Sequence, residues 1–416
     1  MVSQLDHDER PVARCDEMGA FPFSDSPDFL DRTYLSDAHR HAIEALKGWM
    51  VDAGMKVRLD ALGNLVGRYE GTTPNAKALL IGSHIDAVKN GGRYDGPLGV
   101  TVGIECVQAL SARSRRLPFA IEVIAFGDEE GSRFPKAMLC STGLVRPASA
   151  ADLALADKDG VSVAQALALF GLDPAATADA VRSPADILAY IEPHIEQGPV
   201  LETEDLPIGV VTGIAAQLRL KVRIRGQAGH AGTSPMNLRR DAVTAAAEAA
   251  LIVEAVCRAG PQDLRGTVGR FQSTTSAYNV ISGEVEIGVD LRAATSAVRD
   301  AAAAEIRRRL QDAAAARGVE MAIEVIQDLQ GCLCDPGLID QMSRAVEAVG
   351  VRPLQLLSGA AHDAMSLQDL APVAMLFIRC EGGVSHNPAE RVRPADVGIA
   401  VQALLAFIEQ LGRDAA

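Results

Sequence analysis

The chain has 416 residues, of which 48% are hydrophobic and 23% are charged, and its formal net charge at pH 7 is −14. This length and composition predict a globular protein of two or three domains, and they exclude a small disulfide-bonded scaffold and an intrinsically disordered chain. The acidic excess argues against nucleic acid or an anionic membrane as a partner, because no basic surplus exists to neutralise phosphates. Any anionic ligand must therefore be bound by local arginines.

The N-terminus and the cysteines indicate the compartment. The first ten residues include Asp6, Asp8 and Glu9 and no apolar stretch, so a secretory signal is not expected. No uncharged run approaches the roughly 20 residues that a membrane-spanning helix needs. Seven scattered cysteines, an odd number without CxxC spacing, indicate mostly buried, reduced thiols rather than a disulfide framework or a thiolate zinc site. We therefore expect a cytoplasmic protein.

The first part of the chain alternates helical and strand patterns. Residues 38–53 have the apolar spacing of an amphipathic helix, and residues 77–81 and 118–126 are short apolar runs typical of buried strands. This alternation predicts an α/β layer with a mostly parallel sheet.

A different rhythm occupies the segment that follows. This segment has the order β-α-β-β-α-β, which is typical of a ferredoxin-like domain. Its predicted elements are strand 218–225, helix 241–258, strands 267–271 and 284–291, helix 295–317 and strand 319–326.

After residue 331 the first pattern returns, with a helix near 337–349 and a strand at 372–378. The simplest architecture is a larger α/β domain built from residues 1–212 and 328–416. A small α+β domain, residues 213–327, is inserted into it. The two chain crossings between these domains imply a hinge.

Four segments that follow apolar runs carry histidines or carboxylates beside Gly or Pro. Ligands in open α/β sheets bind at the carboxyl ends of strands, which is where such segments lie. Neutral imidazoles together with carboxylates suit a pair of divalent ions bridged by one carboxylate. The candidate side chains in these segments are His84, Asp95, Glu129, Glu130, His194 and His386.

Taken singly, each of these signals has a structural explanation. A loop histidine is usually not a ligand, a Glu-Glu pair is usually a solvated face, and His39 and His41 are expected on the surface of a helix. Three consecutive carboxylates at a strand end, residues 128–130, are nevertheless unfavourable unless a cation or a proton compensates them. The shared context of the four segments therefore favours a dinuclear metal site over four unrelated loops.

Six motifs in fixed order identify a family. Between residues 82 and 391 the chain carries GSHIDAVKNGGRYDGPLGV, GDEEGSRF, HIEQGPVLE, GHAGTSPMNLRRDA, SGAAHDAM and SHNPAER. This set resembles the hydantoinase/carbamoylase family of metal-dependent amidohydrolases, which includes N-carbamoyl-L-amino acid hydrolases, allantoate amidohydrolases and one class of β-ureidopropionase. The resemblance implies an α/β, metallopeptidase-like catalytic domain with an inserted ferredoxin-like α+β domain that acts as lid and dimerisation domain.

The resemblance also implies roles for the residues at strand ends. Asp95 would bridge two divalent metal ions per subunit, and Glu129 would be the general acid/base. The ions would be Zn or Mn, with Co or Ni as alternatives. The implied metal ligands are His84, Asp95, Glu130, His194 and His386.

Further matched positions imply substrate contacts. His230 would stabilise the oxyanion, and Asn279 and Arg292 would bind a substrate carboxylate. In isolation these last two would be interpreted as a turn asparagine and a strand-edge arginine. The same matching makes Gln197 a contact to the carbamoyl group.

The loop of the SGAAHDAM motif resembles the substrate-facing loop of the family, which makes Gly359 and Ala360 substrate contacts and gives His362 a structural role. Ala361 stands where the family usually has glycine, and Pro193 precedes His194 where an apolar residue is usual. Neither departure removes a catalytic atom.

The resulting functional prediction is hydrolysis of a ureido C–N bond on a small carboxylate substrate by a homodimer. Allantoate is the preferred substrate, because RTYLSDAHR and FIRCEGGVSHNPAE resemble the corresponding stretches of bacterial allantoate amidohydrolases. An N-carbamoyl-L-amino acid hydrolase or a β-ureidopropionase is the alternative. A dipeptidase or aminoacylase is more remote, because its relatives usually have a carboxylate in place of His194, and a non-catalytic scaffold would have lost Glu129 or the ligands.

Overall fold

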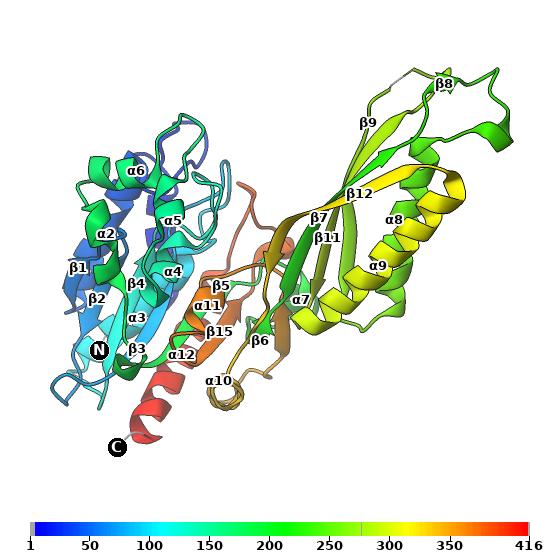
Figure 1. Ribbon diagram of the computed structural model, residues 1–416. Coiled ribbons are helices and arrows are strands. Elements are labelled where there is room, and N and C mark those ends of the chain that lie inside the picture. The colour runs from blue at the N-terminus through cyan, green and yellow to red at the C-terminus, as the bar shows by residue number, and fades with distance from the viewer. Residues whose placement is uncertain (1–4, 276, 415–416) are drawn as a thin grey trace. The chain divides into compact units, whose positions relative to one another are not determined.

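The computed structural model describes residues 5–275 and 277–414 (Figure 1). It divides into two compact units, one formed by Met1–Thr212 with Cys334–Ala416 and the other by Gly213–Leu333. The inserted unit thus ends at Leu333 rather than at 327. The strand pattern continues further than the apolar periodicity indicated, because β12 (Glu320–Leu329) runs three residues longer than predicted and β13 (Cys332–Leu333) pairs with the residues at which the chain enters the unit.

The larger unit is built on a mixed sheet with the strand order β1-β2-β4-β3-β5-β15-β6, and β14 also pairs with β6. The central strands β4, β3, β5 and β15 are mutually parallel, as predicted. The outer strands β2, β1 and β6 run antiparallel to their neighbours, which the sequence patterns did not indicate. The strands are β1 (Lys56–Leu59), β2 (Leu65–Tyr69), β3 (Ala78–His84), β4 (Ala120–Phe126), β5 (Ile187–Ile195), β6 (Ile208–Ile214), β14 (Gln355–Ser358) and β15 (Val373–Ile378).

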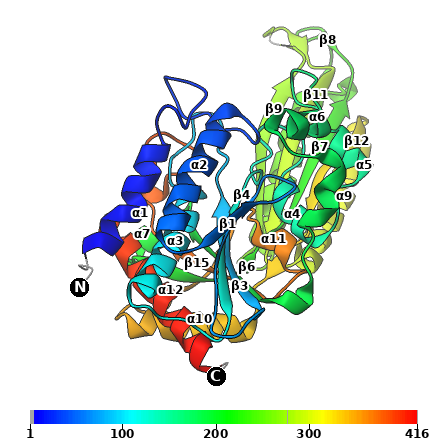
Figure 2. The same ribbon diagram turned by 90° about the vertical axis from the view of Figure 1, so that its left-hand side faces the viewer.

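Long helices cover one face of this sheet, where α1, α3 and α12 pack on one another and α10 packs on α12 (Figure 2). The short helices α4 and α11 pack together, and α11 contacts β5 and β15. The helices are α1 (Leu5–Met18), α2 (Asp37–Asp52), α3 (Pro97–Ala112), α4 (Leu139–Val145), α5 (Ala150–Ala154), α6 (Val163–Phe170), α7 (Val200–Thr203), α10 (Pro336–Ala348), α11 (Ala364–Leu367) and α12 (Pro394–Asp414), with 3-10 turns at Pro174–Ala180, Pro184–Asp186 and Glu381–Gly383.

Burial differs from expectation at His39, and it accounts for the apolar composition of helix α12. Helix α12 is long and apolar enough to cross a membrane by length and composition, but 67% of its apolar window is buried inside the protein, as in a core helix. His39 was expected on the surface and is fully buried, with its Nδ1 accepting a hydrogen bond from the backbone N–H of Leu35. The cysteines follow the prediction in their burial, since six of the seven are buried and only Cys257 is partly exposed.

The smaller unit has the predicted β-α-β-β-α-β order. Its sheet is antiparallel with the order β12-β7-β11-β9, and a short pair, β8 with β10, lies beyond it. Alternate apolar residues of β7 and β11 pack against the two helices, and the opposite face of β7 carries basic residues. The elements are β7 (Ala216–Arg225), β8 (Gly229–His230), a 3-10 turn (Met236–Leu238), α8 (Ala242–Ala259), β9 (Arg265–Ser273), β10 (Val280–Ile281), β11 (Glu284–Ala293) and α9 (Ser296–Arg317), followed by β12.

Glycines let helix α3 approach the sheet at the ends of β3 and β5. Gly96, immediately before the helix, has φ +86°, and a Cβ there would overlap the imidazole of His84. A Cβ on Gly99, inside the first turn, would overlap the backbone carbonyl oxygen of Pro193. The first turn of α3 is therefore held against the backbone on either side of the candidate metal ligands.

Gly99→Ala should lower the stability of the protein, although alanine is the better helix former. The new methyl group would displace the backbone at Pro193, and such overpacking costs about 1–3 kcal/mol. The matched control is Gly48→Ala in α2, where a Cβ meets nothing within 4 Å and stability should rise by up to ~1 kcal/mol. Urea unfolding followed by circular dichroism measures both; a stable Gly99→Ala protein would contradict the packing argument.

Candidate metal centre

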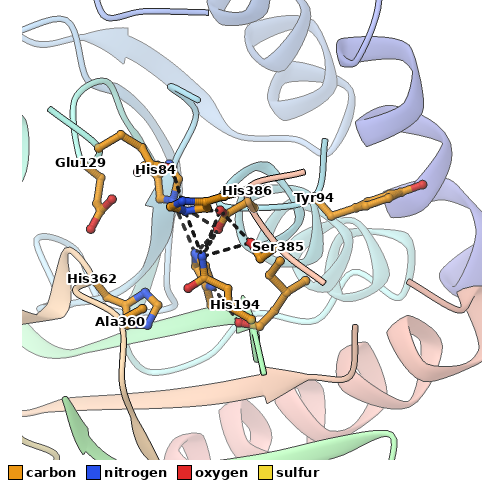
Figure 3. A network of polar contacts seen from close by, with 12 residues as sticks. His84, Tyr94, Glu129, His194, Ala360, His362, Ser385 and His386 are labelled. Atoms are coloured by element: carbon orange, nitrogen blue, oxygen red, sulfur yellow. Dashed lines mark hydrogen bonds and ion pairs between the residues drawn. The ribbon is translucent and has the colours of Figure 1, made fainter. Parts of the chain in front are cut away.

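The five predicted metal ligands converge on one edge of the large sheet. Figure 3 shows three of them, His84, His194 and His386, directed toward one another. Because β3, β4, β5 and β15 are parallel, their carboxyl ends and the loops that follow them meet at this edge. His84 ends β3 and His194 lies in β5, while the other three ligands lie in loops. These loops follow β3 (Asp95), β4 (Glu130) and β15 (His386).

The carboxylate of Asp95 faces two groups of ligands. Its Oδ1 lies 3.3 Å from Nε2 of His194 and 3.9 Å from Nε2 of His84. Its Oδ2 lies 3.1 Å from Nε2 of His386, which in turn lies 3.6 Å from Oε1 of Glu130. Ligand atoms within each group lie within 4.8 Å of one another. A carboxylate with one oxygen directed to each group is arranged to bridge two cations.

The backbone fixes the orientation of two imidazoles. Nδ1 of His84 lies 3.1 Å from the carbonyl oxygen of Asp86, and Nδ1 of His194 lies 2.9 Å from that of Ile195. A carbonyl oxygen only accepts hydrogen bonds, so each Nδ1 carries the proton and each Nε2 directs its lone pair at the centre. This is the tautomer that a metal ligand needs.

Burial and charge shift the pKa values at the centre in opposite directions. Burial would raise the pKa of Asp95, but the hydrogen bond with His386 and the charges of His194 and His84 hold it well below its usual range. Burial raises the pKa of Glu129 well above normal and that of Glu130 to about 7. Buried carboxylates of this kind are stabilised in their charged form by a divalent cation.

Asp86 holds the loop that carries the two glutamates. Its Oδ1 accepts the backbone N–H of Glu129 at 3.0 Å, and its Oδ2 accepts that of Glu130 at 3.1 Å. In Figure 3 the Glu129 carboxylate lies beside the imidazoles, and no dashed line reaches it. A carboxylate oxygen of Glu129 nevertheless lies within 4.8 Å of ligand atoms of His84 and Glu130. Glu129 is therefore in reach of the centre and buried, as a proton carrier must be.

Gln197 and the loop after β14 belong to the same unit as the ligands. The Nε2 of Gln197 donates to both Asp95 oxygens at 3.0 Å. In the loop after β14, which contains Gly359, Ser358 Oγ donates to the carbonyl oxygen of Ala360 at 3.0 Å. The ring of His362, two residues on, packs edge-on against the ring of His194, with 4.4 Å between centroids.

The remaining predicted residues lie in the smaller unit. His230 is exposed, and its Nδ1 accepts the backbone N–H of Gly232 at 3.1 Å, so that Nε2 carries the proton. Asn279 adjoins it, since its carbonyl oxygen accepts the N–H of Ala231 at 2.9 Å. Arg292 lies at the other end of β11, roughly 25 Å away at ~3.3 Å per residue along the strand. The unit therefore brings two of the three residues together.

The sequence analysis gave no role to Ser385 and Glu390. Ser385 Oγ donates to Asp95 Oδ2 at 3.1 Å, and Glu390 accepts the backbone N–H groups of Tyr94 and Asp95. Both residues belong to the SHNPAER motif. Their position beside the ligand His386 is the signal that could have found them.

Comparisons with known proteins agree on the kind of protein. Residues 80–410 match the model of peptidase family M20/M25/M40. The chain is 40% identical to an allantoate deiminase of Arabidopsis thaliana, over 96% of this chain and 82% of that protein. It is also 40% identical to an N-carbamoyl-L-amino acid amidohydrolase of Geobacillus stearothermophilus, over 92% and 94%. The crystal structure of a hydantoinase/carbamoylase family amidase from Burkholderia multivorans matches with a TM-score of 0.89 at 32% identity and covers 97% of both chains.

The metal-free protein should lose stability as the pH rises from about 6.5 to 8. Burial raises the pKa of Glu130 to about 7 and that of Glu192 to about 8, and a hydrogen bond to Asp95 raises that of His386 to about 9. The folded protein therefore binds protons that the unfolded chain has released in this window, and stability falls with pH. Burial lowers the pKa of His194 to about 4, so His194 changes the stability of the protein with pH only below pH 6.5.

Thermal unfolding of chelator-treated protein across this pH range checks the sign. With saturating Mn²⁺ the decline should shrink or reverse, because the cation replaces the protons and binds more tightly at higher pH. A melting temperature that rises with pH in the absence of metal would contradict the assigned shifts.

Proposed function

The chain belongs to peptidase family M20/M25/M40 and to its hydantoinase/carbamoylase amidases, and on that premise we propose that it hydrolyses a ureido C–N bond of allantoate. The relatives named above act on allantoate and on N-carbamoyl-L-amino acids, and both kinds of molecule carry a ureido group and a carboxylate. The observation that carries the proposal is the bridging position of Asp95 between two groups of imidazoles and carboxylates. The products would be ureidoglycine, ammonia and carbon dioxide.

The donor set fits two divalent metal ions per subunit. His84 and His194 would hold one ion, Glu130 and His386 the other, and Asp95 would bridge them. When bound, the ions polarise the ureido carbonyl and make a water molecule acidic near neutral pH. Imidazole and carboxylate ligands accept Zn, Mn, Co or Ni, and Zn or Mn is proposed.

Glu129 would move the proton. Its carboxylate accepts a proton from the attacking water and then donates it to the leaving nitrogen, so that the C–N bond breaks with a neutral amine as leaving group. Burial, which raises the pKa of Glu129, favours the protonated form that the second step requires. Asp86, which binds the backbone N–H of Glu129, holds the carboxyl group in place.

The substrate would be held by groups from both units. The Nε2–H of His230 would donate to the oxyanion that develops on the ureido carbonyl oxygen when water adds to the carbon. The Gln197 amide contacts the ureido group, and Gly359 and Ala360 line its side. Arg292 and Asn279 would bind the substrate carboxylate, and the guanidinium groups of Arg292 and Arg219 both contact the carboxylate of Asp290.

A homodimer would complete the site. In one subunit His230 and Arg292 lie roughly 25 Å apart along the sheet, too far for one small substrate to contact both. One site therefore combines the two residues from different subunits. Arg292 lies opposite Gln217 in the strand register, close in sequence to the point where the chain enters the smaller unit. We therefore assign Arg292 to the site of its own subunit, and His230 and Asn279 to the site of the neighbouring subunit.

The surface for this dimer would be the β9 edge of the small sheet. Within the described residues β9 pairs with β11 alone, so its other edge offers free backbone groups to a second strand. Beside it, helix α8 exposes Val243 and Leu251 with Ala247 and Ala255 at spacings of four, which forms one apolar stripe. An open edge beside an apolar helix face suits two-fold self-association.

A second candidate is hydrolysis of N-carbamoyl-L-amino acids, because the Geobacillus stearothermophilus relative is as similar as the Arabidopsis thaliana one. The metal centre and Glu129 would serve both reactions. The difference would lie in the substrate pocket.

Mn²⁺- or Zn²⁺-loaded protein should release ammonia from allantoate faster than from N-carbamoyl-L-amino acids or N-carbamoyl-β-alanine. Glu129→Gln should lower turnover by about 10²- to 10⁴-fold, because the amide cannot transfer the proton. The metal content of this variant should stay at the wild-type level. Preference for a carbamoyl amino acid would establish the second candidate. No turnover of any of the three by metal-loaded protein would refute both.

Co-expressed Glu129→Gln and His230→Ala subunits should be active together although each is inactive alone. Their heterodimer has one site with an intact Glu129 and the partner's intact His230. Adding Leu251→Glu to both subunits should abolish this recovery and yield monomers in sedimentation. Leu169→Glu in α6, at a leucine that is even more exposed than Leu251, should leave the recovery unchanged. Recovery that is absent in proven heterodimers would place His230 in the site of its own subunit.

A further inference from the structure

Glu390 is a buried carboxylate that belongs to no group of candidate metal ligands. It lies in the loop between β15 and α12, four residues after His386, and is 2% exposed. Its Oε1 accepts the backbone N–H of Tyr94 at 2.9 Å and that of Asp95 at 3.1 Å. One side chain thus binds the peptide of the bridging ligand from a position 295 residues further along the chain.

The other oxygen of Glu390 binds the loop of His386. Ser385 Oγ lies 3.0 Å from Oε2 of Glu390 and 3.1 Å from Oδ2 of Asp95. Oδ2 is the oxygen of Asp95 that faces His386, at 3.1 Å. Glu390 therefore contacts both chain segments whose separation sets the distance between Asp95 and His386.

The sequence provides the space for this contact. A Cβ on Gly92 would overlap the carboxyl carbon and both oxygens of Glu390, so only glycine admits the side chain. On the other side, residues 387–390 form a turn in which Asn387 accepts the N–H groups of Ala389 and Glu390. The turn directs Glu390 back toward the ligand loop.

We propose that Glu390 is a positioning residue that holds Asp95 and His386 in register for the second metal ion. The inference rests on the two-metal centre proposed above and assigns the cause of its geometry. Glu390 positions these ligands through its hydrogen bonds rather than through its negative charge, because the two backbone N–H groups are directed at one of its oxygens. The ion held by His84 and His194 depends less on Glu390, because neither loop that it binds supplies those imidazoles.

Metal binding distinguishes the variants independently of turnover. Equilibrium dialysis against Mn²⁺ with elemental analysis gives the number of ions per subunit and their dissociation constants. Glu390→Ala and Gly92→Ala should keep one ion and bind the second about 10- to 100-fold more weakly, the range for loss of a residue that orients a ligand. Glu390→Gln keeps an acceptor oxygen for both N–H groups and should stay close to the wild-type protein.

Two further variants separate positioning from folding. Ser385→Ala removes the hydroxyl that contacts Oε2 of Glu390 and Oδ2 of Asp95 but keeps both backbone hydrogen bonds to Glu390, and it should weaken the second ion by a smaller factor. Glu381→Gln changes a carboxylate of the same loop that pairs with Arg393 and should bind two ions normally. Thermal melting of the metal-free proteins shows whether each variant folds. If Glu390→Ala does not fold, Ser385→Ala and Glu390→Gln still test the inference.

Several results would overturn the inference. Wild-type dissociation constants in folded Glu390→Ala would exclude positioning, and equal weakening in Glu390→Gln and Glu390→Ala would assign the effect to charge. A wild-type protein that binds one ion would refute the two-metal proposal together with this one. Two ions with no turnover of any ureido substrate would refute the proposed reaction and leave the role of Glu390 intact.

Discussion

The carboxylate of Asp95 is the constraint on which the rest of the larger unit depends. It is buried and accepts from Gln197 and Ser385, while imidazoles face both of its oxygens. A buried negative charge is tolerated only where donors and cations surround it. Parallel strands supply those donors, because they end at one edge and place loops from distant parts of the chain beside one another. The fold therefore both positions the Asp95 carboxylate and supplies the hydrogen-bond donors that its burial requires.

The periodicity of apolar residues predicted the features that depend on neighbouring residues, namely the limits of individual strands and helices. Strand 118–126 and helix 295–317 are found within two residues of their expected limits, and the metal ligands were found because each lies at the end of a strand or in the loop after one. The antiparallel edges β1, β2 and β6 were not predicted, because pairing direction is set by distant partners and not by the pattern of a strand. The burial of His39 was missed for the same reason: its ring packs against that of Phe170, a distant part of the chain, with 5.7 Å between centroids.

The candidate site shows the same limit at finer scale. Side-chain type was enough to identify imidazoles and carboxylates, because metals select them chemically. The role of Glu390 was not visible, since an acidic loop residue looks solvated until its partner N–H groups are located. The separation of His230 from Arg292 was also hidden. Both lie in one small domain, but the strand register places Arg292 at one end of the four-stranded sheet and His230 in the short β8–β10 pair beyond the other end.

Three glycines around Asp95 carry a further consequence. Gly92, Gly96 and Gly99 each leave room for one distant group, respectively the carboxylate of Glu390, the ring of His84 and the carbonyl of Pro193. All three contacts press ligand-bearing segments together, and the one at Gly99 also seats helix α3 on the sheet. Related chains that have lost the metal centre but kept the fold would be released from this requirement. Side chains larger than hydrogen at these positions would then mark such degenerate relatives in a sequence, even where the histidines survive.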